Sequence, residues 1–294
     1  MRMAHRAGYA AIVGRPNVGK STLLNALVGA KVAIVTPKPQ TTRNRILGIR
    51  TLPEAQVIFL DTPGIHEARS LLNRRMVHVA RQALDEADVV VLVVDAAAGV
   101  TPADRALAES LAGLARPTVV VLSKRDRVRP PVLLPAMAAM GTLLPGREII
   151  PASARTGENV SVVLDAVVTA LPAGPPLYPE DEYTAATERF LAEELIREQL
   201  FLQTEEEIPY GTAVQVEEFR ARPNLLLVRA TILVDRPNHK GIVIGAGGAQ
   251  LGEIGRRARL ELEAVFGSKV FLELFVRAEP GWAKDPRRLE ELGL

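Results

Sequence analysis

The stretch AIVGRPNVGKSTLLNAL, residues 11–27, decides the fold of the N-terminal half of the chain. An apolar run enters a glycine-rich segment, and a run of helical length follows it. The segment GRPNVGKS matches G-x-x-x-x-G-K-[ST], in which backbone N–H groups and a helix N-terminus surround phosphate oxygens. The alternative is a glycine-rich turn that matches this pattern by chance. Such a turn would not need a strand directly before it and a helix directly after it. The stretch therefore predicts a nucleoside triphosphate site formed by Gly14, Arg15, Pro16, Asn17, Val18, Gly19, Lys20, Ser21 and Thr22.

Composition places the chain among ordinary globular proteins. It has 294 residues, of which 48% are hydrophobic and 24% charged, with a formal net charge of +2. This length allows two domains or one large one. The chain has no cysteine, which excludes a disulfide framework or a thiolate metal site and is typical of a cytosolic protein. No apolar run reaches membrane-spanning length, and the N-terminus lacks the apolar core of a secretory signal.

Short apolar runs alternate with helical stretches over the first 172 residues. The predicted strands are 10–13, 57–60, 89–94, 119–122 and 149–150. The predicted helices are 21–28, 71–84, 102–114 and 160–171. Continuous apolar strands are buried on both faces, as in a parallel sheet. The alternation predicts a doubly wound α/β domain over residues 1–172.

The pattern changes after a proline-rich and acidic segment, which we interpret as a linker over residues 173–184. A second, smaller α+β domain is predicted over residues 185–294. Its expected elements are a helix at 185–202, strands at 212–219 and 225–234, a helix at 249–266 and a strand at 269–277. The last strand alternates with a period of two, as expected for a sheet with one buried face.

The residues after the fourth predicted strand indicate which base is bound. Ser123-Lys124-Arg125-Asp126 ends that strand with an x-K-x-D element, at the sheet edge where α/β proteins bind ligands. A carboxylate only accepts hydrogen bonds, and guanine offers two adjacent N–H donors where adenine does not. Asp126 therefore predicts guanine, with the Lys124 stem over the ring. The segment Ser153-Ala154-Arg155 follows the next strand, where a backbone N–H can meet guanine O6.

Between these motifs, Asp61-Thr62-Pro63-Gly64 has the D-x-x-G arrangement, followed by Ile65. We expect Asp61 to bind Mg²⁺ through water and the Gly64 N–H to approach the γ-phosphate. One threonine of the upstream loop should also ligate Mg²⁺; Thr42 is favoured over Thr41. Ser21, Thr42 and Asp61 are then the candidate magnesium residues. Lys20, Thr42 and Gly64 are the candidate catalytic residues.

These motifs together resemble the bacterial Era GTPases, and the resemblance covers nearly the whole chain. It implies a P-loop GTPase domain followed by a type II KH domain, whose G-x-x-G turn is Gly245-Ala246-Gly247-Gly248 here. It also implies GTP hydrolysis with Mg²⁺, binding to 16S rRNA near its 3′ end, and assistance to 30S subunit assembly. A cytoplasmic monomer is expected, with peripheral membrane association as a further property of such proteins.

The sequence departs from this family at two places. Ser123 stands where the family usually has Asn, which predicts a weaker tie between the guanine loop and the phosphate loop. The G-x-x-G turn has no basic residue inside it, so RNA phosphates would depend on backbone N–H groups and on Lys240, Arg256, Arg257 and Arg259. These arginines could equally form a solvated helix face.

A further difference, this one from Ras-like enzymes, concerns catalysis. Ile65 replaces the glutamine with which Ras-like enzymes orient water, so hydrolysis is expected to be slow. His66 could act instead, although an isolated loop histidine is usually only solvated. Related GTPases with this apolar substitution use K⁺, which Asn17 would help to bind.

Two other classes of function compete with a GTPase that binds ribosomal RNA. A GTP-gated interaction protein would dock its C-terminal domain on a protein or membrane surface, although acidic runs such as 205–207 oppose binding to anionic lipid. A biosynthetic enzyme that uses GTP would need a second pocket rich in acid–base residues, and the sequence offers none.

Overall fold

The computed structural model describes residues 5–64 and 70–294. Its residues form two compact units. The first comprises 5–33, 42–64 and 75–185, and the second comprises 34–41, 70–74 and 186–294. Residues 34–41 thus belong to the second unit although they lie within the sequence of the first. In the described part of the chain, no helix is both long and apolar enough to cross a membrane.

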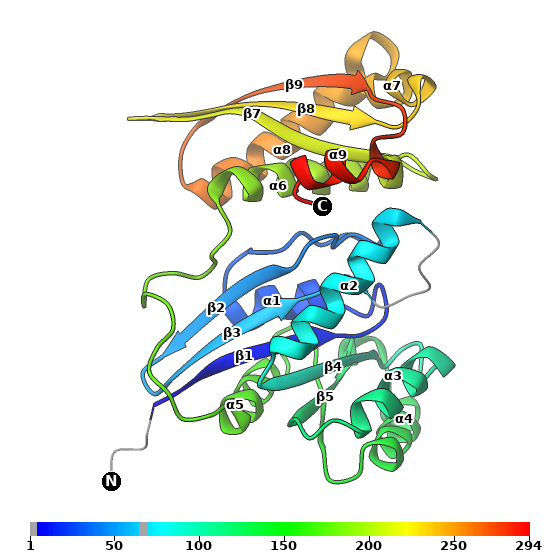
Figure 1. Ribbon diagram of the computed structural model, residues 1–294, viewed down its shortest axis with the longest axis vertical. Helices are drawn as coiled ribbons and strands as arrows, with labels where there is room; N and C mark the ends of the chain where they lie inside the picture. The colour runs from blue at the N-terminus through cyan, green and yellow to red at the C-terminus, as the bar shows by residue number, and fades with distance from the viewer. Residues whose placement is uncertain (1–4, 65–69) are drawn as a thin grey trace. The chain divides into compact units, whose positions relative to one another are not determined.

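The first unit is built on a six-stranded sheet with the order β2-β3-β1-β4-β5-β6 (Figure 1). Its strands are β1 (Arg6–Val13), β2 (Ile46–Leu52), β3 (Ala55–Asp61), β4 (Val89–Asp95), β5 (Thr118–Ser123) and β6 (Glu148–Pro151). All neighbouring pairs are parallel except β2 and β3, which are antiparallel. The central strands β3, β4 and β5 are almost entirely buried, as their continuous apolar runs predict.

Helices alternate with the strands along the sequence and cover the sheet. They are α1 (Lys20–Val28), α2 (Leu71–Glu86), α3 (Pro102–Ala112), α4 (Pro130–Leu143) and α5 (Val160–Ala170). The first residues of α2, up to Arg74, belong to the second unit. The start of α3 is fixed by a capping box, in which Thr101 and Asp104 bond each other's backbone N–H, with proline at the first position. The predicted doubly wound α/β class is confirmed.

Two elements of this unit were not predicted. Strand β2 mixes Arg50 and Thr51 with apolar residues, because it is an edge strand that does not need the uniform apolar composition of the central strands. Helix α4 contains Pro130, Pro131 and Pro135, and proline is unfavourable in the interior of a helix. Two of these prolines stand at the helix start, where no backbone N–H partner is needed, and only Pro135 lies inside.

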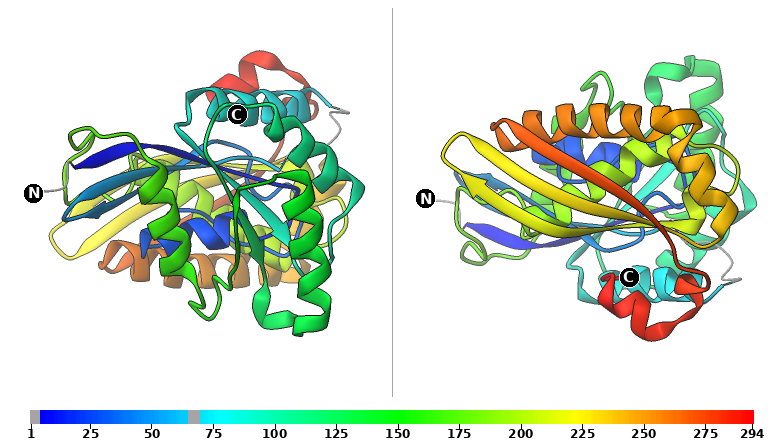
Figure 2. Two further views of the ribbon diagram at one scale, coloured as in Figure 1. Left: turned by 90° about the horizontal axis from the view of Figure 1, so that it is seen from below. Right: turned by 90° about the horizontal axis from the view of Figure 1, so that it is seen from above.

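The second unit has a three-stranded sheet with the order β7-β8-β9 (right view of Figure 2). Its strands are β7 (Thr212–Arg222), β8 (Leu225–Val234) and β9 (Val270–Ala278). Strands β7 and β8 are antiparallel, and β8 and β9 are parallel. Its helices are α6 (Glu188–Gln203), α7 (Pro237–Ile244), α8 (Ala249–Phe266) and α9 (Pro286–Glu291). This arrangement confirms the predicted α+β class.

Helices α6 and α8 pack against each other and against the sheet, and the apolar faces of these elements form one core. Leu272, Leu274 and Val276 of β9 pack on that core, as the period of two predicts. Helix α7 was not predicted as a helix, because its eight residues include a proline and a glycine. It leads directly into the 245–248 turn and so sets the direction of that turn.

Candidate active site and candidate RNA-binding surface

The phosphate loop connects β1 to α1 in the first unit. The Nζ of Lys20 points back into this loop and donates to the carbonyl oxygens of Gly14 at 3.2 Å and Arg15 at 3.0 Å. Burial lowers the pKa of Lys20 to about 8, although the nearby Asp61 carboxylate raises it. Phosphate oxygens in this loop would take the place of these carbonyls as partners of Lys20, and their negative charge would favour the protonated amine.

The neighbouring positions of the loop hold it against other elements. The Arg15 guanidinium donates to the fully buried Asp104 carboxylate of α3 at 2.8 Å. Asn17 is exposed and has a left-handed backbone conformation, with φ of 62°. The carbonyl oxygen of Asn17 accepts a bond from Lys124 at 2.7 Å. Thr22 follows Ser21 in the first turn of α1 and is half-buried.

Three polar side chains far apart in sequence meet at the start of α1. The Ser21 hydroxyl donates to Asp61 Oδ2 at 2.5 Å, and its oxygen lies 2.9 Å from Thr42 Oγ1. Thr42 Oγ1 is also 3.5 Å from Asp61 Oδ2. The Thr41 hydroxyl instead donates to the Lys38 carbonyl at 2.7 Å and contacts Thr36. Of the two threonines, Thr42 is therefore the one beside Ser21 and Asp61.

This cluster fits a magnesium ion. Asp61 is completely buried, which raises the pKa of its carboxyl, and its Oδ1 has no hydrogen-bond partner among the described residues. A buried carboxylate oxygen without a partner is costly unless a cation compensates it. Mg²⁺ commonly uses only one or two carboxylates and completes its shell with water and phosphate oxygens. Ser21, Thr42 and Asp61 supply such a set.

The D-x-x-G segment lies directly against the phosphate loop. A side chain on Gly64 would place its Cβ 2.6 Å from the backbone nitrogen of Pro16, so only glycine allows this approach. The neighbouring Thr62 hydroxyl donates to the Ile12 carbonyl of β1 at 3.0 Å and anchors the segment, and Pro63 is buried beside it. Ile65 and His66 lie outside the described residues.

The predicted guanine residues converge at the ends of β5 and β6. Asp126 Oδ1 accepts a bond from the buried Ser153 hydroxyl at 2.7 Å, and Arg155 forms an ion pair with Asp126 at 2.8 Å. The bond from Ser153 is the main cause that lowers the pKa of Asp126, and the charge of Arg155 adds to it. Arg155 is largely exposed, so it can leave the carboxylate when a base arrives.

Other bonds hold these loops together. Lys124 donates to Asp95 at 2.6 Å, and the Arg125 backbone N–H donates to the Ala152 carbonyl at 3.1 Å, just before Ser153 and Ala154. Ser123 reaches the phosphate loop: its hydroxyl lies 2.5 Å from the Val18 carbonyl oxygen. The serine therefore keeps a bond to the phosphate loop where the sequence predicted a weaker tie.

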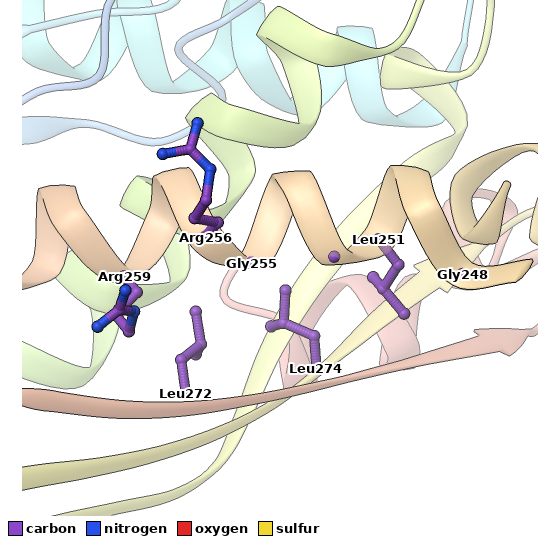
Figure 3. A pocket seen from close by; sticks show the side chains of 8 residues that line it. Gly248, Leu251, Gly255, Arg256, Arg259, Leu272 and Leu274 are labelled. Carbon is purple, nitrogen blue, oxygen red and sulfur yellow. The ribbon is translucent and has the colours of Figure 1, made fainter.

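The second unit contains a groove of about 380 Å³ between α8 and β9 (Figure 3). Leu251, Leu272 and Leu274 form its apolar part, and the side chains of Leu272 and Leu274 extend from β9 toward α8. Arg256 and Arg259 of α8 add positive charge. Gly248, the last residue of the predicted turn, also lines the groove, so the groove begins where the turn ends.

Only some of the predicted RNA-binding residues line this groove. Arg256 and Arg257 both bond Glu253, and these bonds lower the pKa of Glu253 to about 2. Arg256 lines the groove, whereas Lys240 and Arg257 are not among its lining residues. Beyond Gly248, Arg256 and Arg259, sequence reasoning did not identify the residues that line the groove. Its signal was the pair Gly252 and Gly255 inside a helix, which leaves room for a ligand between α8 and β9.

Comparison with known proteins finds two families that match different parts of the chain. The family described as "50S ribosome-binding GTPase" matches residues 9–124, and the family described as "KH domain" matches residues 207–283. GTPase Era of Syntrophus aciditrophicus is 49% identical over 291 residues, covering 98% of this chain and 95% of that protein.

Two solved structures are similar over the full length. One is an Aquifex aeolicus Era variant bound to GDP and AlF4⁻, with a TM-score of 0.94, 43% identity and coverage of 98% of this chain and 99% of that chain. The other is Era in complex with MgGDPNP and nucleotides 1506–1542 of 16S ribosomal RNA, with the same TM-score, identity and coverage. With a P-loop GTPase site, a KH domain and these full-length relatives, the chain belongs to the GTPase Era family and is a GTP-hydrolysing enzyme.

Proposed function

We propose that this GTPase binds single-stranded RNA in the groove between α8 and β9, and that the RNA is 16S rRNA near its 3′ end. The groove beside the 245–248 turn is the observation that carries the proposal. The relative solved with MgGDPNP and a 16S rRNA segment supports the choice of RNA. By the same likeness, we propose that the protein assists assembly of the 30S subunit.

The chemistry of the groove suits unpaired nucleotides. The leucines offer an apolar surface for the faces of bases, and the two arginines can pair with phosphates or stack on bases. The exposed Ala246 and Gly247 present backbone that a phosphodiester can approach closely. Arg256 must exchange its ion pair with Glu253 for a phosphate, and this exchange limits the gain in affinity.

We further propose how the nucleotide is held. Ser21 and Thr42 ligate Mg²⁺ directly and Asp61 does so through water, where the ion neutralises charge on the β- and γ-phosphates. Lys20 contacts both phosphates, and the Gly64 N–H contacts the γ-phosphate. Asp126 accepts from guanine after Arg155 has moved away. Asn17 contributes to a K⁺ site at the exposed edge of the loop.

Several wider properties follow from this function. We propose a GTPase domain over residues 1–172, a linker over 173–184 and a KH domain over 185–294. A ribosomal target implies a cytoplasmic site of action. The protein would act as a monomer, because both proposed sites are formed from residues of one chain. Peripheral membrane association remains an expectation from the family.

Filling the groove tests the RNA proposal. Gly255 has its Cβ position 3.5 Å from a methyl group of Leu274, so Gly255→Leu places a large side chain in the groove. Gly255→Ala is the matched control, since both changes raise helix propensity. We expect Gly255→Leu to weaken binding of the 16S rRNA 3′ segment at least tenfold, and GTP hydrolysis without RNA to stay unchanged.

Crosslinking in cells followed by sequencing would then identify the RNA. Recovery of the 3′ region of 16S rRNA supports the proposal. If wild-type protein crosslinks to no ribosomal RNA and Gly255→Leu binds the segment as tightly as Gly255→Ala, the RNA assignment fails. A GTP-gated protein that docks on a protein or membrane surface would then be the better description.

A further inference from the structure

The C-terminal end of α6 is held by a segment from elsewhere in the sequence. The last carbonyl groups of a helix have no partner within it. Here the Nζ of Lys38 donates to the Phe201 carbonyl oxygen at 2.6 Å and also to the carbonyl oxygen of Thr204, the residue that follows the helix. A cation at this end is also favoured by the helix dipole. Lys38 therefore caps the C-terminal end of α6.

A second contact holds the same segment along the helix. The Glu198 carboxylate, one turn before the end of α6, accepts a bond from the Val35 backbone N–H at 2.8 Å. Both contacts lie within the second unit, to which residues 34–41 belong. The segment is also bonded internally, because the Thr36 and Thr41 hydroxyl oxygens are 2.6 Å apart and Thr41 donates to the Lys38 carbonyl. A shift of Thr41 would therefore move Lys38.

The 245–248 turn is attached to the same end of α6. Gln250, the second residue of α8, donates through Nε2 to the Gln203 carbonyl oxygen at 2.5 Å. The turn packs directly on this glutamine: a Cβ on Gly245 would lie 2.7 Å from the Cβ of Gln250. The carbonyl groups at the end of α6 thus accept from Lys38 on one segment and from Gln250 on another.

Residues 34–41 continue covalently into Thr42, whose Oγ1 lies 2.9 Å from that of Ser21 in the first unit. A ligand that fixes Thr42 would therefore restrain the segment that carries Lys38. Loops in GTPases are commonly ordered by contacts to the γ-phosphate and Mg²⁺ and released after hydrolysis.

We propose that Lys38 and Gln250 are positioning residues that couple the two sites through the C-terminal end of α6. When Thr42 is held by Mg²⁺ and GTP, Lys38 caps α6 and fixes the carbonyl that holds Gln250, and the 245–248 turn is set for RNA. Loss of the γ-phosphate frees Thr42 and weakens this support. The inference rests on the proposed function, since it needs RNA at the turn. Thermodynamic linkage requires RNA to tighten GTP binding by the same factor.

The test measures how nucleotide changes RNA affinity. The dissociation constant of full-length protein for an RNA with the sequence of the 16S rRNA 3′ segment is measured with GDP and with a non-hydrolysable GTP analogue, both with Mg²⁺. For wild type we expect about fivefold or more tighter binding with the analogue, the lower end of usual allosteric coupling. Lys38→Met keeps the chain length but removes the N–H donors, and the ratio should fall to below about twofold.

Lys269→Met is the matched control, because Lys269 is 80% exposed and its nearest carboxylate, Glu263, is 3.7 Å away. It should keep the wild-type ratio. Gln250→Met tests the other half of the route and should lower the ratio in the same way. The double variant should lose no more coupling than either single variant, because both act through one element.

Three results would overturn the inference: a wild-type ratio near one, an unchanged ratio in either single variant, or losses that add fully in the double variant. Failure of the proposed function would look different, since wild type would then bind no RNA in either nucleotide state. If Lys38→Met does not fold, Gln250→Met tests the route alone. An unchanged ratio of RNA affinities in Gln250→Met is then sufficient to reject the route.

Discussion

The hydroxyl oxygen of Ser123 lies 2.5 Å from the carbonyl oxygen of Val18, which joins the guanine loop to the phosphate loop. The same hydroxyl is 3.1 Å from the Val94 carbonyl oxygen. A hydroxyl has one proton to donate, whereas the amide of asparagine has two. The serine in this chain therefore makes one bond at a time to the two carbonyls, and the shorter one is to the phosphate loop.

Removing that bond should weaken nucleotide binding but keep base selection. Ser123→Ala leaves the buried Val18 carbonyl without this donor, and a lost bond of this kind usually costs about 0.5–1.5 kcal/mol. We expect GTP and GDP affinities to fall about two- to tenfold, measured by displacement of a fluorescent guanine nucleotide. Ser110→Ala, an exposed serine on α3, is the control. Unchanged affinity in Ser123→Ala would show that the bond does not support the site.

Asp126 should determine the base. Wild type should bind GTP and GDP far more tightly than ATP, because the carboxylate accepts from both guanine donors. Asp126→Asn should shift preference toward xanthine nucleotides, since its amide can donate to the 2-oxygen of xanthine. Competition binding with GTP, XTP and ATP measures the shift. Equal competition by ATP and GTP in wild type would contradict the guanine assignment.

Hydrolysis should be slow and respond to the monovalent cation. We expect a higher rate in K⁺ than in Na⁺ at equal ionic strength, and loss of this difference in Asn17→Ala. Lys20→Ala should weaken GTP binding and abolish turnover, because the phosphates lose their buried charge. Phosphate release at constant Mg²⁺ measures both effects. A potassium effect that persists in Asn17→Ala would remove Asn17 from the cation site.

RNA binding at the 245–248 turn should be affected less by an added neutral side chain than by an added negative charge. Nothing lies within 4 Å of the Cβ position of Gly247, and its φ of +57° is one that Asp and Asn adopt more readily than most residues. Gly247→Asp should therefore fold, but repulsion of phosphates should weaken RNA binding at least about tenfold, or roughly 1.4 kcal/mol. Gly247→Asn has the same shape without the charge and should lose less. Equal RNA affinities for Gly247→Asp and wild type would exclude this turn from the RNA surface.

Glu193 on α6 should make stability depend on pH. Burial raises the pKa of Glu193, although its Oε1 accepts a bond from the Val216 N–H at 2.8 Å. A raised pKa in the folded state means that the protonated acid is favoured by folding. This stabilisation is complete below the unfolded pKa of about 4.3 and is lost as pH rises through the higher folded value.

Gln at position 193 keeps the acceptor but has no charge to desolvate. Glu193→Gln should therefore be more stable than wild type at pH 8, and the difference should shrink toward pH 4. Urea unfolding at several pH values measures this. Glu188→Gln is the control, because Glu188 is exposed at the start of the same helix. A constant difference across this range would show that Glu193 is not the cause.

The sequence by itself determined the fold class and predicted a set of residues for the nucleotide site. The phosphate loop could be predicted because its eight residues are contiguous and their pattern is typical of loops whose backbone N–H groups bind phosphate. Long apolar strands likewise predicted the parallel sheet, since burial on both faces leaves no other composition. Strand β2 and helix α4 escaped prediction because an edge position and tolerated prolines relax those local rules.

Only the tertiary structure decided which separated residues meet. Thr42 rather than Thr41 lies beside Ser21 and Asp61, a choice made by the path of the chain. The groove between α8 and β9 is lined by two glycines of α8 and two leucines of β9, which lie far apart in the sequence. Lys38 reaches the end of α6 across more than 160 residues of sequence. Such contacts depend on packing between distant segments, and no local pattern of residue types encodes them.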